Sequence, residues 1–237
     1  MSGHSKWASI KHKKYAADAK RGKVFSKMAK QIAVAVKEGS ADFGMNFSLR
    51  LLVDKAKKVN MPKDVIERAI QKGSGTGGEG AMYSAIYEAM GPGGSAIIIE
   101  TLTDNTNRTL GNVKTIVTKK GGNFGAKIAW MFDQKGVIRV PGINVEKPKD
   151  ELELALIDAG AEDIQYDEDS FVVYTAVPDL KNVIDALTAL DIDAGDAGIE
   201  FVAKDSLELS DSDSAKLFDL IEVIEEDDDV SNVYTNV

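Results

Sequence analysis

The residues best suited to chemistry lie at the start of the chain, where cations alternate with aromatic rings. Lysine and arginine neutralise nucleic-acid phosphates and release counterions, and aromatic rings stack on unpaired bases. Seven cations occur within 18 residues, with three rings among them and a fourth just before the first cation. The cations are Lys6, Lys11, Lys13, Lys14, Lys20, Arg21 and Lys23, and the rings are His4, Trp7, His12 and Tyr15. This composition predicts a nucleic-acid-binding segment, and the alternative is a charged tail that keeps the protein in solution.

The positive charge extends beyond this segment. Residues 1–75 contain 17 Lys and Arg against 6 Asp and Glu, residues 76–145 contain 7 against 5, and residues 146–237 contain 5 against 27. A basic surface attracts phosphate and an acidic surface repels it. A tail alone would not carry its charge through a whole domain, so we expect nucleic acid to contact the entire N-terminal part. The further cations predicted to bind are Lys27, Lys30, Arg50, Lys57 and Lys58.

A polar loop in the middle of the chain is a second candidate for ligand binding. The sequence TDNTNRT at residues 103–109 opens a helical pattern, and the N–H groups at a helix N-terminus attract anions. Asn105 and Arg108 could reach a ligand from this position. The alternative is that the loop only caps the helix. The sequence leaves both interpretations open.

Catalytic and metal chemistry find little support. The chain has no cysteine, and its two histidines lack nearby carboxylate or thiolate ligands, so no metal site is predicted. No nucleophile, base and orienting group occur together, and GSGTGG follows a helical pattern, which is the wrong context for a dinucleotide. The acidic run Glu225–Asp229 lacks EF-hand spacing and is interpreted as a solvated helix end. We therefore predict a protein that is not an enzyme and has no cofactor or small-molecule substrate.

Compartment can also be predicted from composition. The longest apolar stretches, such as Ile32–Val36, fall short of the roughly 20 residues that a membrane helix needs. No apolar segment follows the basic N-terminus, so a secretory signal is not readable there. The absence of cysteine suits a reducing compartment. These features predict a soluble, cytoplasmic protein without a membrane partner.

Helices must position the cations of the N-terminal part. Apolar residues recur at three- and four-residue spacing over Lys23–Lys37, and similar patterns predict helices over Asn46–Asn60 and after Pro62. Three amphipathic helices of this length can pack into one bundle. The glycine-rich segment Gly73–Gly80 is interpreted as a linker, so a domain boundary is expected there.

The rest of the chain alternates strand and helix patterns. Strands are predicted over residues 95–102 and 127–132, with a helix over 109–120 between them. From residue 136 the predicted order is β-α-β-β-α-β, that of a ferredoxin-like unit. A surplus helix and strand near the C-terminus are expected to return to the middle domain. The predicted fold is α+β with three domains, namely a basic helical bundle at 1–78, an α/β middle domain at 79–133 plus 206–237, and an acidic ferredoxin-like domain at 134–205.

Several motifs are specific enough to indicate a family. They are GHSKW, IKHKK, DAKRGKVFSK, NMPKDVIERAI, GPGG, LTDNTNRT, KKGGN, AWMF and DDDVSNVYTN. Over essentially the whole chain the sequence resembles the YebC/PmpR family, whose eukaryotic members include the mitochondrial translational activator of cytochrome c oxidase. The resemblance implies the same three-domain division. It also implies nucleic-acid contact by Lys6, Trp7, Lys11, His12, Lys13, Lys14, Lys20 and Arg21, with Asn105 and Arg108 as further candidates.

The chain departs from the family pattern at one loop. Only Phe124–Ile128 lie between KKGGN and AWMF, where the family has a longer loop containing serine and glycine. A ligand contact by that loop is therefore not carried over. No extension precedes GHSKW, which favours a bacterial-type cytoplasmic protein over an imported one.

The family has been described both as DNA-binding transcriptional regulators and as translation factors at the ribosome. No helix-turn-helix with base-reading residues and no heptad dimerisation segment is evident. A large acidic body with one basic region would be held away from most phosphate surfaces and would dock in one orientation. We therefore expect a ribosome-associated translation factor whose partner is ribosomal RNA or tRNA. The alternatives are a transcriptional regulator on duplex DNA and a protein-interaction adaptor.

Overall fold

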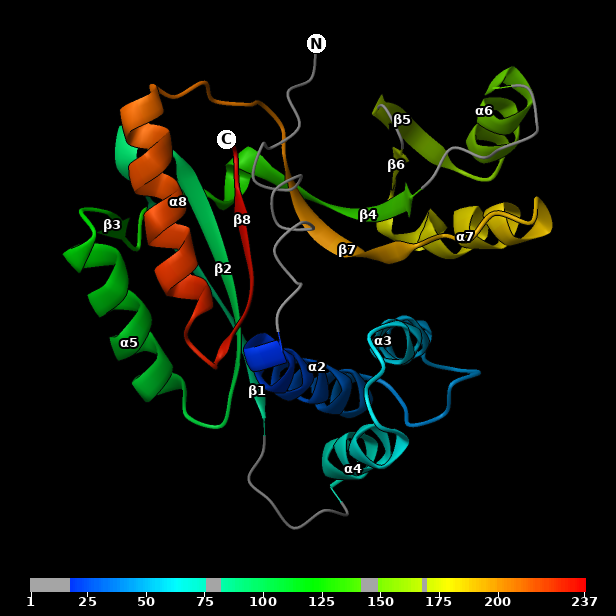
Figure 1. The fold of residues 1–237 in the computed structure, drawn as a ribbon, viewed down its shortest axis with the longest axis horizontal. Helices are drawn as coiled ribbons and strands as arrows, with labels where there is room; N and C mark the ends of the chain where they lie inside the picture. Colours follow the sequence, from blue (N-terminus) through cyan, green and yellow to red (C-terminus); the bar gives the residue numbers. More distant parts are fainter. Residues whose placement is uncertain (1–17, 76–81, 142–148, 168–169) are drawn as a thin grey trace. The chain divides into compact units, whose positions relative to one another are not determined.

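The computed structural model describes residues 18–75, 82–141, 149–167 and 170–237. The chain forms two compact units (Figure 1). One unit contains the residues up to Phe132 together with Ala203–Val237, and the other is Asp133–Val202. No helix in these described ranges is long and apolar enough to cross a membrane.

The N-terminal helices of the first unit pack around an apolar core. They are α2 (Asp18–Glu38), α3 (Phe47–Lys58) and α4 (Lys63–Gly73). Asn46 caps α3, since its side-chain oxygen accepts a hydrogen bond from the Leu49 N–H at 3.0 Å. Each helix turns its apolar stripe inward, as the spacing predicts. The buried core consists of Met28, Ile32, Val36, Leu49, Val53, Ala56, Met61, Ile66 and Ala69.

A four-stranded antiparallel sheet completes the first unit, in the order β3-β1-β2-β8. The helices α5 (Thr106–Lys119) and α8 (Asp211–Glu225) cover one face of this sheet (Figure 1). Ile97, Ile99 and Val233 of the sheet pack there against Val113 of α5 and Leu217 of α8. The C-terminal helix and strand therefore join this sheet. The elements are β1 (Tyr83–Met90), β2 (Ala96–Thr103), α5 (Thr106–Lys119), β3 (Asn123–Phe124), α8 (Asp211–Glu225) and β8 (Val230–Thr235).

The strand predicted over residues 127–132 is wrong. The chain there forms the 3-10 helix η2 (Ala129–Met131), and the strand begins only at Phe132. The Glu88 carboxylate accepts hydrogen bonds from the N–H groups of Ile128 and Ala129, at 2.6 and 2.7 Å. These two bonds satisfy backbone donors at the start of η2, which a local strand pattern cannot reveal.

The second unit follows the predicted order of elements. Its sheet has the strand order β5-β6-β4-β7, with antiparallel pairs between β4 and β6 and between β5 and β6. That order, with a helix after the first and third strands, is the arrangement of a ferredoxin-like unit. The elements are β4 (Phe132–Pro141), α6 (Lys149–Asp158), β5 (Ala161–Asp167), β6 (Ser170–Thr175), η3 (Val177–Asp179), α7 (Leu180–Ala189) and β7 (Asp196–Ala203).

The fold is thus mixed α and β, with two small antiparallel sheets. Val34 of α2, Met82 and Leu102 of β2 form a small apolar cluster that joins the helices to the first sheet. Lys37 adds a hydrogen bond from its Nζ to the Met82 carbonyl at 2.6 Å. Residues 18–75 and the sheet therefore lie within one compact unit, and a separate domain at 1–78 stays a prediction.

Candidate nucleic-acid interface

Most of the basic N-terminal segment lies outside the described residues. This applies to Lys6, Trp7, Lys11, His12, Lys13 and Lys14. The backbones of Lys20 and Arg21 belong to α2. The binding roles of these eight residues stay predictions from the sequence.

Three predicted lysines lie in a row along α2, and each donates a hydrogen bond to a backbone carbonyl at or just after the C-terminal end of α8. The distances from Nζ to the carbonyl oxygen are 3.3, 2.7 and 2.8 Å. The last carbonyls of a helix have no partner within it and carry partial negative charge, so cations stabilise them. The pairs are Lys23 with Glu226, Lys27 with Glu225, and Lys30 with Asp228.

Burial lowers the pKa of Lys27, and the charges of Glu225 and Asp228 act in the opposite direction. Lys27 therefore donates to a carbonyl in a partly desolvated position. Lys23 and Lys27, both predicted to contact phosphate, therefore bind backbone carbonyls of the protein itself.

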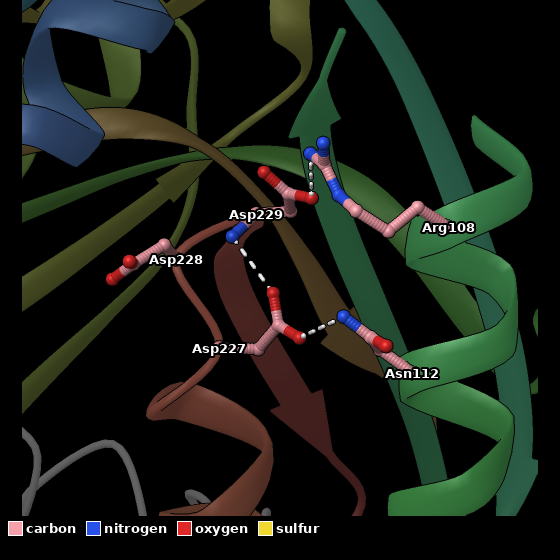
Figure 2. Close-up of a pocket in the computed structure, with 5 residues that line it drawn as sticks. All are labelled: Arg108, Asn112, Asp227, Asp228 and Asp229. Atoms are coloured by element: carbon pink, nitrogen blue, oxygen red, sulfur yellow. Dashed lines mark hydrogen bonds and ion pairs between the residues drawn. The ribbon is translucent and has the colours of Figure 1, made fainter. Parts of the chain in front are cut away.

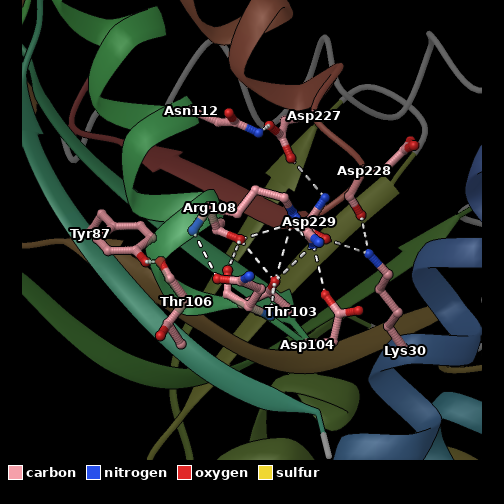
Figure 3. A network of polar contacts seen from close by, with 12 residues as sticks. Lys30, Tyr87, Thr103, Asp104, Thr106, Arg108, Asn112, Asp227, Asp228 and Asp229 are labelled. Carbon is pink, nitrogen blue, oxygen red and sulfur yellow. Dashed lines mark hydrogen bonds and ion pairs between the residues drawn. The ribbon is translucent and has the colours of Figure 1, made fainter. Parts of the chain in front are cut away.

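The carboxylate of Asp229 is the centre of the polar network that follows α8 (Figure 3). Its side chain is only 7% exposed. Lys30 of α2 donates to Oδ1 at 2.7 Å, and Arg108 of α5 donates to Oδ2 at 2.7 Å. The hydroxyls of Thr109 and Thr103 also donate to Oδ2, at 2.8 and 3.1 Å. Two predicted binding residues that are far apart in the sequence therefore meet at one buried carboxylate.

The interpretation of Glu225–Asp229 as a solvated helix end is wrong for Asp229. Burial alone would raise the pKa of Asp229, but hydrogen bonds from Arg108, Lys30 and Thr109 outweigh it and hold the pKa well below its usual range. The position of Asp229 directly before the apolar strand β8 is the only sequence signal of burial, and it does not identify the cationic partners.

Asn105 caps α5, as the helix-cap alternative for the loop at residues 103–109 predicts. Its side-chain oxygen accepts a hydrogen bond from the Arg108 N–H at 3.0 Å. Arg108 also donates through Nη2 to Asp104 at 2.8 Å, and its side chain is 47% exposed. Arg108 therefore anchors Asp229 while part of its guanidinium faces solvent.

A shallow hollow of about 280 Å³ lies beside this network (Figure 2). Asn112 donates to Asp227 at 3.2 Å across it. One cation and three carboxylates line the hollow, so its charge opposes a phosphate ligand. The lining residues are Arg108, Asn112, Asp227, Asp228 and Asp229.

The remaining predicted cations lie on the outer side of the helices. Arg50 donates to the Phe43 carbonyl at 3.3 and 3.0 Å. Lys57 pairs with Asp54 at 3.2 Å, and its side chain is 65% exposed. Lys58 is also exposed, in the same last turn of α3. This turn therefore presents positive charge to solvent.

Two family models together match most of the chain. Residues 5–76 match a family model described as the TACO1/YebC protein N-terminal domain, and residues 82–237 match the TACO1/YebC second and third domain. A probable transcriptional regulatory protein of Desulfitobacterium hafniense is 47% identical, with 100% of this chain and 95% of the relative covered. A protein of the same description from Desulforamulus reducens is 45% identical, with 100% and 98% covered.

A solved structure is also similar. It is the crystal structure of a conserved hypothetical protein from Aquifex aeolicus, with a TM-score of 0.87 and 39% identity. The likeness covers 98% of this chain and 96% of that one.

Proposed function

The chain belongs to the TACO1/YebC family, and from this premise we propose that it is a non-enzymatic regulator of gene expression that binds nucleic-acid phosphates with its basic N-terminal part. We further propose that it acts as a ribosome-associated translation factor, bound to ribosomal RNA or tRNA. The family assignment agrees with the resemblance found in the sequence.

The observation that carries this proposal is the separation of charge between parts of the fold. Residues 18–75, which form α2 to α4, contain 13 Lys and Arg against 6 Asp and Glu. The unit Asp133–Val202 contains 5 against 17. Phosphate attracts the first surface and repels the second, so a polyanion should engage the helical part alone.

Transcriptional regulation on duplex DNA is the second candidate. The relatives from Desulfitobacterium hafniense and Desulforamulus reducens are described as probable transcriptional regulatory proteins. The short turn between α3 and α4, at residues 59–62, also favours this candidate because helix-turn-helix proteins join two helices in that way.

A competition experiment separates the two candidates. Purified protein is offered ribosomes, structured RNA, a promoter duplex and a random duplex of equal length at fixed salt, and affinity ratios are measured. We expect ribosomes or RNA to compete best. A promoter preference of about a thousandfold over random duplex would instead establish a sequence-specific DNA regulator.

A matched pair of triple variants tests the basic segment. Replacing Lys11, Lys13 and Lys14 by alanine should weaken binding to every nucleic acid alike and flatten the dependence of affinity on salt, since phosphate contacts are lost. Replacing Lys181, Lys204 and Lys216 removes the same charge elsewhere and should have little effect. Equal losses from both triples would show that net charge, and not this segment, controls binding.

A further inference from the structure

A groove of about 400 Å³ lies between α2 and α4. It is separate from the Asp229 network, apart from Lys30, which lies in both. Small and apolar residues make up half of its lining, and cations and polar groups make up the rest. The lining residues are Ser26, Ala29, Lys30, Ala33, Val65, Arg68, Ala69, Gln71, Lys72 and Met82.

Close packing of the two helices fixes the shape of this groove. Gly73, the last residue of α4, lies so near α2 that an added Cβ would come within 2.3 Å of the Ala33 carbonyl oxygen. Ala29, Ala33 and Ala69 have side chains too short to fill the remaining space between the helices. The groove is therefore a consequence of small residues at a tight helix crossing, and its apolar part is formed before any ligand arrives.

The cations around the groove are suited to a phosphate. Among the residues that the structure describes, Arg68 pairs with Asp64 of its own helix, and both side chains are 70% exposed. Such an exposed surface pair contributes little to stability, so a phosphate can replace the carboxylate easily. Lys72 lies one turn further along α4 and also lines the groove. Lys30 is held in place by Asp229 and the Asp228 carbonyl (Figure 3).

We propose that this groove binds one unpaired nucleotide of a single-stranded nucleic acid. The base packs on the partly exposed apolar lining formed by Ala29 and Val65, and an adjacent phosphate contacts Arg68 and Lys72. A base inside a duplex is stacked and paired, so only an unpaired base can enter. The inference rests on the proposed function and adds to it the site and the kind of strand that is recognised.

The test measures the affinity of the full chain for a short fluorescent oligouridylate and for a hairpin duplex of the same length. The groove variant is Arg68→Gln with Lys72→Gln. Its control is Lys114→Gln with Lys119→Gln, two exposed lysines of α5 that lower the charge equally. We expect a loss of about tenfold or more for the single strand with the groove variant and about threefold or less with the control.

A steric variant tests the groove without changing charge. Ser26→Trp places a bulky ring in the groove, whereas Ser48→Trp places it on an exposed position of α3 that does not line the groove. We expect only Ser26→Trp to weaken oligouridylate binding, with the hairpin little affected. Circular dichroism shows whether each variant is folded, and the charge variants decide the matter if Ser26→Trp is not.

The outcomes separate the two levels of inference. Equal losses in both charge variants, or equal affinity of the wild-type protein for single strand and hairpin, would overturn the groove assignment while leaving the proposed function in place. Absence of wild-type binding to ribosomes, RNA and DNA alike would overturn the proposed function, and the groove assignment with it.

Discussion

Lys30 and Arg108 hold opposite oxygens of one buried carboxylate, that of Asp229, at 2.7 Å each. The two cations come from α2 and α5, and Asp229 directly precedes β8. This arrangement ties the helical part of the first unit to its sheet. Both cations were predicted to bind phosphate, and in the structure they first neutralise a group of the protein's own chain.

Replacing Asp229 by asparagine should destabilise the first unit. The change keeps the shape of the side chain but removes the counterion of Lys30 and one of the two carboxylates that Arg108 binds, and breaking a buried ion pair in this way is costly. We expect a loss of about 2–3 kcal/mol in the free energy of unfolding, somewhat below the usual range because Arg108 is partly exposed. Urea denaturation followed by circular dichroism measures it.

The control is Asp228→Asn, because the Asp228 side chain is exposed and only its backbone carbonyl binds Lys30. Its effect should stay within about 0.5 kcal/mol. If the two variants lost the same stability, the Asp229 carboxylate would not be the centre of the network.

The contribution of Asp229 should depend on pH in a defined direction. Its pKa is held well below the usual range in the folded protein, so the unfolded chain takes up the proton first as the pH falls. The stability gap between wild type and Asp229→Asn should be full above about pH 4 and shrink by about 1.4 kcal/mol per pH unit below it. Urea midpoints of both proteins across this range would show a constant gap if Asp229 had an ordinary pKa.

Gly73→Ala should destabilise the helical bundle. An alanine Cβ at this position would lie 2.3 Å from the Ala33 carbonyl oxygen and 2.7 Å from the Val36 Cβ, so α4 would have to move away from α2. Overpacking of this kind costs about 1–3 kcal/mol. Thermal unfolding measures the loss.

Gly111→Ala is the matched control within α5. Nothing lies within 4 Å of a Cβ at Gly111, which is exposed. Here the same substitution should stabilise the protein by about 0.5–1 kcal/mol, because alanine loses less conformational freedom in a helix. A loss at both positions would mean that the contact of Gly73 with α2 is not the cause.

Tyr174 should make the second unit sensitive to alkaline pH. Burial raises the pKa of Tyr174 to about 12, with Arg139 acting against this shift and Glu200 adding to it. The unfolded chain loses the phenol proton near its ordinary pKa of about 10, whereas the folded protein keeps it, so stability falls as the pH rises from about 10 towards 12.

Tyr174→Phe removes the titrating group and tests this dependence. Between about pH 10 and pH 12 the variant should lose less stability than the wild type in urea denaturation. Parallel pH profiles for the two proteins would count against the assignment.

Much of the fold could be predicted from local pattern. The spacing of Met28, Ile32 and Val36 indicated an inward helix face, and the order of strand and helix patterns after residue 136 indicated a ferredoxin-like unit. The family was also readable from its motifs. Such predictions succeed because helix and strand periodicity are properties of neighbouring residues.

The failures were of another kind. Where a strand was predicted over residues 127–132, the chain forms η2, because the Glu88 carboxylate on β1 accepts hydrogen bonds from two backbone N–H groups of that segment. Asp229 was interpreted as solvated, although it is buried among Lys30, Arg108 and two threonines. Neither the Glu88 contacts nor the partners of Asp229 can be recognised from residue spacing, since both join residues that are remote in the chain.

The sequence by itself therefore determined the family, the amphipathic elements and the separation of basic from acidic residues, all of which follow from composition, motif and local period. Tertiary structure alone decided which cations face solvent and which neutralise the protein's own carbonyls and carboxylate, and it created the groove between α2 and α4. Ion pairing and close packing depend on which distant residues meet, and folding settles that by burying apolar faces against one another.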